Sequence, residues 1–319
     1  MNILIANDTR VENHHGCSRV MNCIDKNISK RGQFNLKYMP LLHNWSNYEN
    51  SKKLILTSDL VLINGEGTLH DNANHVDILL DIITFADVYR VPTVIINCTV
   101  FNLSKINLLK LSKSKLIYVR DKASQNYLKE NKINSKYCPD LTFWKTNENL
   151  GKVLRNKIGI TDGFAFKPSN KHIKSRNLEL FSIFNQKQAL ASYSFIRRLI
   201  TKNFFLSHLS NREMVSVNNH VNFFAYLAKF KFVITGRYHI VCFCIYLNIP
   251  FKYIESNTPK ISYLIDDIGL NKGKFKFDNS YKIIEYNSTE NDLINKFKIN
   301  ATVSIDKMFD TILNFKNYD

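Results

Sequence analysis

The stretch FVITGRYHIVCFCIYLNIPF, residues 232–251, contains the pattern from which the fold prediction starts. Residues 232–235 form an apolar run typical of a buried strand, and residues 240–247 form a longer run that fits either a helix or a second strand. The basic residues Arg237 and His239 stand between the two runs. If the second run is a helix, these residues lie in its first turn, where free backbone N–H groups and a nearby arginine favour an anion.

Strand-like runs alternate with helical patterns along the chain. The first half has apolar strands at 2–6, 60–63, 92–96 and 116–119, with an amphipathic helical pattern at 76–89. The second half has a strand at 157–160, helices near 187–202 and 219–229, strands at 203–207 and 251–254, and a helical C-terminus. Continuous apolar strands separated by helices predict parallel sheets that are covered on both faces.

The chain has 319 residues, which is long for one core and predicts two domains. We place an N-terminal α/β lobe at 1–150, a C-terminal α/β lobe at 151–300, and a C-terminal helix at 301–319 that packs back. The polar residues 145–156 are typical of a linker between the lobes. Ligands of such sheets bind beyond the carboxyl ends of the strands, so we expect a cleft between the two lobes.

The composition is basic, with 44 Lys and Arg against 27 Asp and Glu and a net charge of +17. The lysines are scattered and no nucleic-acid-binding motif is visible, so we expect no nucleic-acid partner. No run approaches the ~20 apolar residues of a membrane span, and the N-terminus lacks a signal-peptide pattern. Six cysteines without a CxxC pair indicate the reduced thiols of a cytoplasmic protein. The charge favours peripheral contact with the inner face of the cytoplasmic membrane.

The segment Asn-His-His-Gly-Cys, residues 13–17, follows the first predicted strand and precedes a predicted helix. Gly16 would let a ligand approach the backbone closely, so His14 and His15 are candidates for acceptor binding. A metal would need a third ligand, and adjacent histidines usually point apart, so we expect no metal here. A polar loop that caps the helix is the alternative interpretation.

Residues 64–72, Asn-Gly-Glu-Gly-Thr-Leu-His-Asp-Asn, directly follow another buried strand. The glycines around Glu66 predict a tight turn, although the spacing is neither a GxGxxG fingerprint nor a P-loop. A carboxylate on such a turn is a candidate general base for an acceptor hydroxyl, and Glu66 and His70 are the candidates. The alternative is a structural turn with polar surface residues.

Two further basic residues follow predicted strands. Arg120 precedes Asp121, a predicted helix N-cap, and either contacts the acceptor or braces the loop. Lys260 follows the last strand of the second lobe and is a candidate second cation for an anionic donor, together with Gly236, Arg237 and His239.

Taken together, these motifs resemble the polysaccharide pyruvyl transferase superfamily. The motifs that carry the resemblance are Asn13–Gly16, Asp59 with Gly65-Glu66-Gly67, Arg120-Asp121 with Ser124 and Leu128, Pro139-Asp140, Gly236-Arg237-Tyr238-His239, Asn248-Ile249-Pro250, and Lys260 with Leu264 and Gly269-Leu270. Their order and spacing cover about residues 1–270.

The resemblance implies a GT-B-like pair of Rossmann-type lobes whose parallel sheets face a central cleft. It implies transfer of a carboxyethylidene (pyruvyl ketal) group from phosphoenolpyruvate, without a cofactor, to a saccharide or lipid-linked saccharide of a capsule, lipopolysaccharide or related glycan. Arg237 would then bind the phosphate or carboxylate of the donor, and His239 would act as an acid or as an anion ligand.

Two other functions remain open on the sequence. Glu66 stands where the family's usual triple glycine has its middle member, and it would supply the base for a GT-B glycosyltransferase that uses a nucleotide sugar. A non-catalytic glycan-binding or scaffold protein is the third hypothesis.

Overall fold

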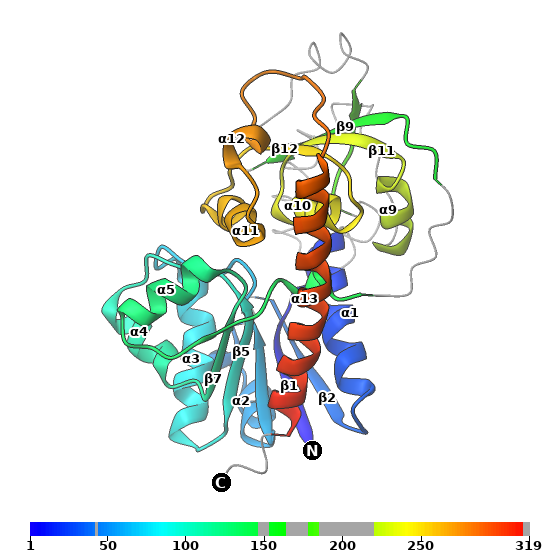
Figure 1. Cartoon of the computed structure of the whole chain (residues 1–319). Coiled ribbons are helices and arrows are strands. Elements are labelled where there is room, and N and C mark those ends of the chain that lie inside the picture. The colour runs from blue at the N-terminus through cyan, green and yellow to red at the C-terminus, as the bar shows by residue number, and fades with distance from the viewer. Residues whose placement is uncertain (42–43, 146–152, 164–177, 185–219, 315–319) are drawn as a thin grey trace. The chain divides into compact units, whose positions relative to one another are not determined.

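The computed structural model describes residues 1–41, 44–145, 153–163, 178–184 and 220–314 (Figure 1). Contacts within the chain divide it into two compact units. Unit 1 consists of Met1–Arg10, Val20–Trp144 and Asn300–Asp319, and unit 2 consists of Val11–Arg19 and Lys145–Ile299.

Unit 1 is built on a six-stranded parallel sheet with the order β2-β1-β3-β5-β7-β8. The strands are β1 (Asn2–Asp8), β2 (Asn35–Pro40), β3 (Leu60–Asn64), β5 (Thr93–Cys98), β7 (Leu116–Val119) and β8 (Lys136–Tyr137). A separate parallel ladder joins β4 (Leu69–His70) to β6 (Val100–Phe101). The four strands predicted in the first half of the sequence are therefore confirmed.

Alternate residues of the central strands face two separate apolar clusters. In β1, Leu4 and Ala6 belong to one cluster, whereas Ile3 and Ile5 belong to the other, because successive side chains of a strand point to opposite faces. Helices α2 (Glu49–Leu56), α3 (Asn74–Val88), α4 (Lys105–Ser112) and α5 (Lys122–Glu130) contribute to the first cluster, and α1 (His15–Ser29) and α13 (Ser288–Leu313) contribute to the second. The sheet is thus covered on both faces, as continuous apolar strands require.

The C-terminal part of α13 packs against the sheet of unit 1. Its buried residues Ile305, Met308, Phe309 and Ile312 recur every three or four positions and belong to the cluster that contains Ile3. This confirms the prediction that the C-terminal helix packs back. The helix begins earlier than predicted, at Ser288.

Unit 2 contains a four-stranded parallel sheet with the order β10-β9-β11-β12. The strands are β9 (Lys157–Gly163), β10 (Glu179–Leu180), β11 (Phe230–Gly236) and β12 (Phe251–Tyr253), and the described helices are α9 (His220–Leu227), α10 (Tyr238–Tyr246), α11 (Lys260–Ile268) and α12 (Lys272–Phe275). Three short 3-10 helices, η1 (Thr9–Glu12), η2 (Trp45–Asn47) and η3 (Leu141–Phe143), complete the described elements. The apolar run that fitted either a helix or a strand in the sequence is the helix α10.

One prediction differs from the structure, and three others lie wholly or partly outside the described residues. The segment 11–19 was expected within the lobe 1–150, but its contacts group it with unit 2. The helix near 187–202 and the strand at 203–207 lie outside the described residues, as does part of the linker at 145–156. The regrouping of the segment 11–19 has consequences for the candidate site, because the segment contains both adjacent histidines.

We predict that Phe309→Ala destabilises unit 1 by about 3–5 kcal/mol, because it removes a fully buried ring from the contact between α13 and the sheet. Val303→Ala is the matched control on the same helix, since Val303 is 62% exposed, and it should change the free energy of unfolding by less than about 0.5 kcal/mol. Urea unfolding followed by tryptophan fluorescence measures both, because both tryptophans, Trp45 and Trp144, lie in unit 1. Equal effects of the two substitutions would show that the end of α13 is not part of this core.

Candidate functional site

The junction between β11 and α10 places the two basic residues of the opening stretch at the start of a helix. β11 ends at Gly236, Arg237 is the N-cap residue of α10, and His239 lies in its first turn. The backbone N–H of Arg237 donates to Thr235 Oγ1 at 3.0 Å, which orders the turn. His239 is buried, whereas 22% of the Arg237 side chain is exposed. The arginine is therefore the more accessible of the two basic groups.

The guanidinium of Arg237 is held by Asp162, a residue that the sequence analysis did not select. Arg237 Nε donates to Asp162 Oδ1 at 2.9 Å, and Nη2 donates to Asp162 Oδ2. The guanidinium also lies over the ring of Phe184, 5.2 Å from its centroid. Asp162 is near the end of β9, and a carboxylate just before a glycine at a strand end is the signal that could have identified it. The pair orients the arginine and leaves part of its donor fork for other groups.

The two adjacent histidines of the segment 11–19 point to different surroundings. The His14 ring lies 5.2 Å from the His239 ring and 5.0 Å from Phe184, measured between centroids. The His15 ring instead stacks on Phe223 at 4.4 Å with an interplanar angle of 17°. His14, assigned to the acceptor from the sequence, thus lies beside His239, which was assigned to the donor.

Gly16 makes the approach of this segment to His239 possible. A Cβ atom built on Gly16 would lie 2.2 Å from His239 Cγ, so no other residue fits without displacing the imidazole. The adjacent backbone is held as well, since the N–H of His15 donates to the Ile183 carbonyl at 3.0 Å. The glycine that the sequence analysis expected to admit a ligand is therefore used for packing against a side chain of the same unit.

The imidazole of His14 is held in its neutral form. Burial lowers the pKa of His14 well below 6.5, and the neighbouring His239, Arg237, His15 and Lys260 lower it further. Lys260 is the first residue of α11, and its Nζ donates to Asn257 Oδ1 at 3.0 Å. The predicted cations Arg237 and Lys260 therefore both act electrostatically on the same buried imidazole.

In unit 1, Glu66 occupies the turn that follows β3. Its backbone has a positive φ of 41°, and its carboxylate Oε1 accepts hydrogen bonds from Thr9 Oγ1 at 2.7 Å and Asn64 Nδ2 at 3.1 Å. The Glu66 carbonyl accepts from the N–H of Thr99 at 2.8 Å. Glu66 is only 7% exposed, and these hydrogen bonds fix its carboxylate at the carboxyl edge of the sheet.

Three asparagines lie at the carboxyl ends of adjacent strands in the same sheet. Asn7 is near the end of β1, Asn64 ends β3, and Asn97 is near the end of β5. Asn7 Oδ1, Asn64 Oδ1 and Asn97 Nδ2 are buried and have no hydrogen-bond partner among the described residues. Buried polar atoms normally have partners, so these atoms mark positions where a polar ligand or water would bind. Asn7 and Asn97 were not predicted from the sequence as site residues, although each follows an apolar strand run.

His70, the other candidate base, belongs to a more exposed group. Its Nδ1 lies 3.0 Å from Asp71 Oδ2, and its ring lies 5.5 Å from that of His75. Hydrogen bonds from Asn102 and His70 lower the pKa of Asp71. A histidine bonded to a carboxylate has a defined tautomer, and this arrangement is compatible with base chemistry at His70.

Arg120 is buried in a polar network that connects three segments of unit 1. Its Nη1 donates to Asp140 Oδ2 at 2.9 Å and its Nε donates to Thr99 Oγ1 at 2.9 Å. Thr99 in turn donates to Asp121, whose carboxylate caps α5 by accepting from the N–H of Ser124. Arg120 and Asp140 are 2% and 0% exposed. These are the contacts of an arginine that braces the loop, which was one of its two predicted roles.

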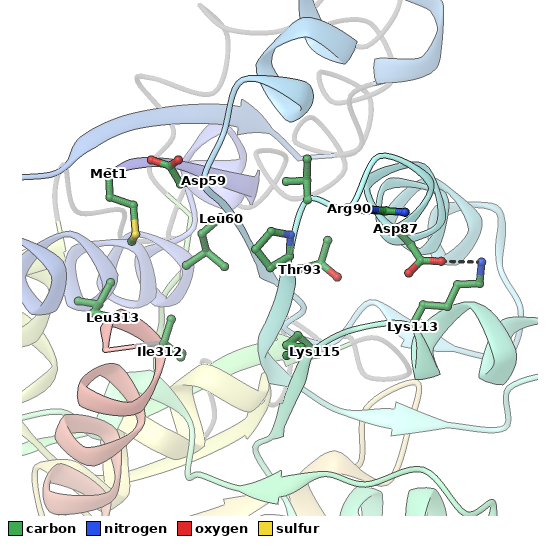
Figure 2. A pocket seen from close by; sticks show the side chains of 12 residues that line it. Met1, Asp59, Leu60, Asp87, Arg90, Thr93, Lys113, Lys115, Ile312 and Leu313 are labelled. Atoms are coloured by element: carbon green, nitrogen blue, oxygen red, sulfur yellow. Dashed lines mark hydrogen bonds and ion pairs between the residues drawn. The ribbon is translucent and has the colours of Figure 1, made fainter. Parts of the chain in front are cut away.

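A cavity of about 520 Å³ lies at the other edge of the sheet of unit 1 (Figure 2). It is lined by residues at the amino ends of strands, including Leu60 and Thr93, and by Ile312 near the end of α13. Figure 2 also shows the ion pair between Lys113 and Asp87 at 3.0 Å. Because ligands of parallel α/β sheets bind at the carboxyl edge, we do not assign this cavity to the candidate site.

Comparison with known proteins finds the same family that the order of the sequence motifs indicated. A family model described as polysaccharide pyruvyl transferase matches residues 18–258. A sequence search of curated proteins finds no match.

Two solved structures illustrate the fold. UDP-GlcNAc 2-epimerase from Neisseria meningitidis, bound to UDP-GlcNAc, has a TM-score of 0.56 at 12% identity, covering 98% of this chain and 100% of that chain. An uncharacterized protein from Klebsiella pneumoniae has a TM-score of 0.50 at 12% identity, covering 86% of this chain and 92% of that chain. At such identities the likeness shows the fold alone, which is a GT-B-like α/β fold with parallel sheets.

Proposed function

The chain belongs to the polysaccharide pyruvyl transferase family, and from this premise we propose that it transfers the pyruvyl group of phosphoenolpyruvate to a saccharide or lipid-linked saccharide of a bacterial capsule or lipopolysaccharide. The observation that carries the donor assignment is the guanidinium of Arg237, which Asp162 orients at the N-terminus of α10. Transfer of a pyruvyl group to a polysaccharide is the activity of the family.

The groups around Arg237 match the chemistry of phosphoenolpyruvate, which carries a carboxylate and a phosphate. An arginine binds either group through a planar fork of N–H donors, and Lys260 adds a second cation. The dipole of α10, whose N-terminal end carries Arg237 and His239, favours an anion at the same place. Asp162 is a positioning residue in this scheme, because it fixes the orientation of the guanidinium through two nitrogens.

Pyruvyl transfer requires one proton to be added to the donor and two protons to be removed from the acceptor. C3 of the enol gains a proton, C2 forms bonds to two acceptor oxygens, and the bond from C2 to the phosphate oxygen breaks. Of the two protons that the acceptor hydroxyls lose, one balances the proton gained at C3 and the other leaves with the phosphate. His239, in the first turn of α10, is the candidate to protonate C3 or to bind the leaving phosphate.

Glu66 is the better supported base for the acceptor hydroxyl. It is buried and held by Thr9 and Asn64, whereas His70 lies in the more exposed group with Asp71. The buried amide atoms of Asn7, Asn64 and Asn97 at the same sheet edge are suited to bind sugar hydroxyls, which both donate and accept hydrogen bonds. The acceptor would therefore bind to unit 1 and the donor to unit 2.

We predict that phosphoenolpyruvate raises the melting temperature of the full chain, because a ligand that binds only the folded state stabilises it by about 2.7 kcal/mol at a hundredfold excess over Kd. Arg237→Met should abolish this shift. Lys272→Met, which removes an exposed lysine of the same unit, should preserve it. CMP, UDP and GDP serve as competing ligands in the same assay. Stabilisation by one of these nucleotides and none by phosphoenolpyruvate would favour the nucleotide-sugar glycosyltransferase instead.

We predict that Glu66→Gln lowers kcat by about 10²–10⁴-fold, since glutamine keeps the shape of the side chain but cannot accept a proton. The assay measures phosphate released from phosphoenolpyruvate in the presence of a saccharide fraction from the source cell envelope. The melting shift caused by phosphoenolpyruvate should stay as in the wild type. A large loss in His70→Gln with little loss in Glu66→Gln would move the base to His70, and full activity of Arg237→Met in cells would favour a scaffold.

We also propose that the chain works at the anionic face of the cytoplasmic membrane, on the basis of its net charge of +17. Among the described helices none is both long and apolar enough to cross a membrane, so contact would be peripheral. Co-sedimentation with phosphatidylserine vesicles, lost in high salt, is the expected result. Equal recovery with neutral vesicles, or no binding at physiological salt, would contradict the proposal.

A further inference from the structure

Three side chains in unit 2 that are suited to bind a metal converge on one buried position. His14 precedes α1, Cys17 lies in the first turn of α1, and His239 lies in the first turn of α10. Taking one ring nitrogen from each histidine and the sulfur of the cysteine, the three atoms all lie within 4.8 Å of one another. All three residues are buried, with 2% to 9% of their surface exposed.

We infer that His14, Cys17 and His239 form a binding site for a thiophilic divalent cation of the zinc class. Two imidazoles and one thiolate are the ligand types that zinc prefers, and three protein ligands leave a fourth position for water or an anion. In a tetrahedral zinc site the ligand atoms stand about 3.3–3.8 Å apart. Because the three atoms already lie within 4.8 Å of one another, each separation needs to shorten by at most about 1.5 Å to reach these values.

From the sequence we expected no metal because a third ligand was missing, and the fold supplies that ligand. The adjacent histidines do point apart, since His15 stacks on Phe223 while His14 faces His239. The further ligands come instead from Cys17, three positions after His14, and from His239, 225 positions after His14. Gly16 permits this convergence, because its backbone lies against the His239 ring.

An acidic side chain adjoins the proposed sulfur ligand. Glu12 Oε2 accepts a hydrogen bond from Cys17 Sγ at 3.5 Å. Glu12 is therefore the adjacent acceptor for the proton that the thiol releases when it binds a metal. The nearby Arg237 is paired with Asp162, so these two charges cancel.

Binding of a metal at Nδ1 of His14 would break two hydrogen bonds. Its Nδ1 accepts from the N–H groups of Gly16 at 3.1 Å and Cys17 at 3.4 Å. A cation bound at this nitrogen would replace both bonds, of which the one to Cys17 is long.

The inference goes beyond pyruvyl transfer and stands on these side chains alone. It does constrain the proposed mechanism at one residue. A His239 that is bound to the metal cannot protonate C3. It would act only as a ligand of the metal, and the metal would bind the anionic donor. The readouts below measure metal and not turnover, so failure of the metal site leaves the assignment of the transferase intact.

The test uses the full chain after removal of any histidine tag, depleted of metal by a chelator and then titrated with Zn²⁺. We expect one zinc ion per chain, measured by calorimetry and by metal analysis after gel filtration. Cys17→Ser should weaken zinc binding by at least about a hundredfold. Cys23→Ser, which changes another buried cysteine of α1, is the matched control and should bind zinc like the wild type.

A second measurement needs no variant and so does not depend on how well a substituted chain folds. Cobalt(II) added to the wild-type protein should give the visible bands of a tetrahedral site and a thiolate charge-transfer band in the near ultraviolet. Cys17→Ser, with unchanged circular dichroism, should lose the charge-transfer band. Absence of that band in the wild type, or zinc affinity that is equal in Cys17→Ser and the wild type, would overturn the inference.

Discussion

The close approach of Gly16 to the imidazole of His239 holds the segment 11–19 in unit 2, and the candidate site of that unit depends on it. A side chain at position 16 would occupy the space of the imidazole. The contact brings His14 and Cys17 to the first turn of α10, so residues from the beginning and the last third of the chain share one polar cluster. Without it, Arg237 and Lys260 would remain, but the buried imidazole and thiol beside them would not.

The ion pair between Arg237 and Asp162 has a different role from the buried pair between Arg120 and Asp140. Both carboxylates orient a guanidinium, but 22% of the Arg237 side chain is exposed against 2% for Arg120. An arginine that is oriented and still accessible can exchange part of its hydration for an anionic ligand. Breaking the ion pair of a fully buried arginine costs more free energy than the binding of a ligand would recover. Arg120 therefore stabilises the loops around it.

The carboxyl edge of the sheet in unit 1 combines rigid and unsatisfied polar groups. Glu66 is fixed by a positive φ and by hydrogen bonds from Thr9 and Asn64. The nearby asparagines keep buried amide atoms without partners among the described residues, which costs stability unless a ligand or water binds there. An edge of this kind is suited to select the orientation of a hydroxyl-rich acceptor, and we propose that the rigid carboxylate receives the proton of that acceptor.

Local patterns in the sequence were sufficient to predict the central parallel strands and the positions of Arg237 and Glu66 at strand ends, whereas they left the run at 240–247 as either a helix or a strand. Apolar runs and glycine turns are properties of neighbouring residues, and a parallel sheet buried on both faces allows few other patterns. Asp162 as the partner of Arg237, Cys17 beside His239, and the burial of Arg120 were decided by the tertiary structure alone. Each of these features requires contact between segments that are distant in the sequence. Which segments come into contact depends on the packing of the whole fold, such as the close approach of Gly16 to the His239 imidazole.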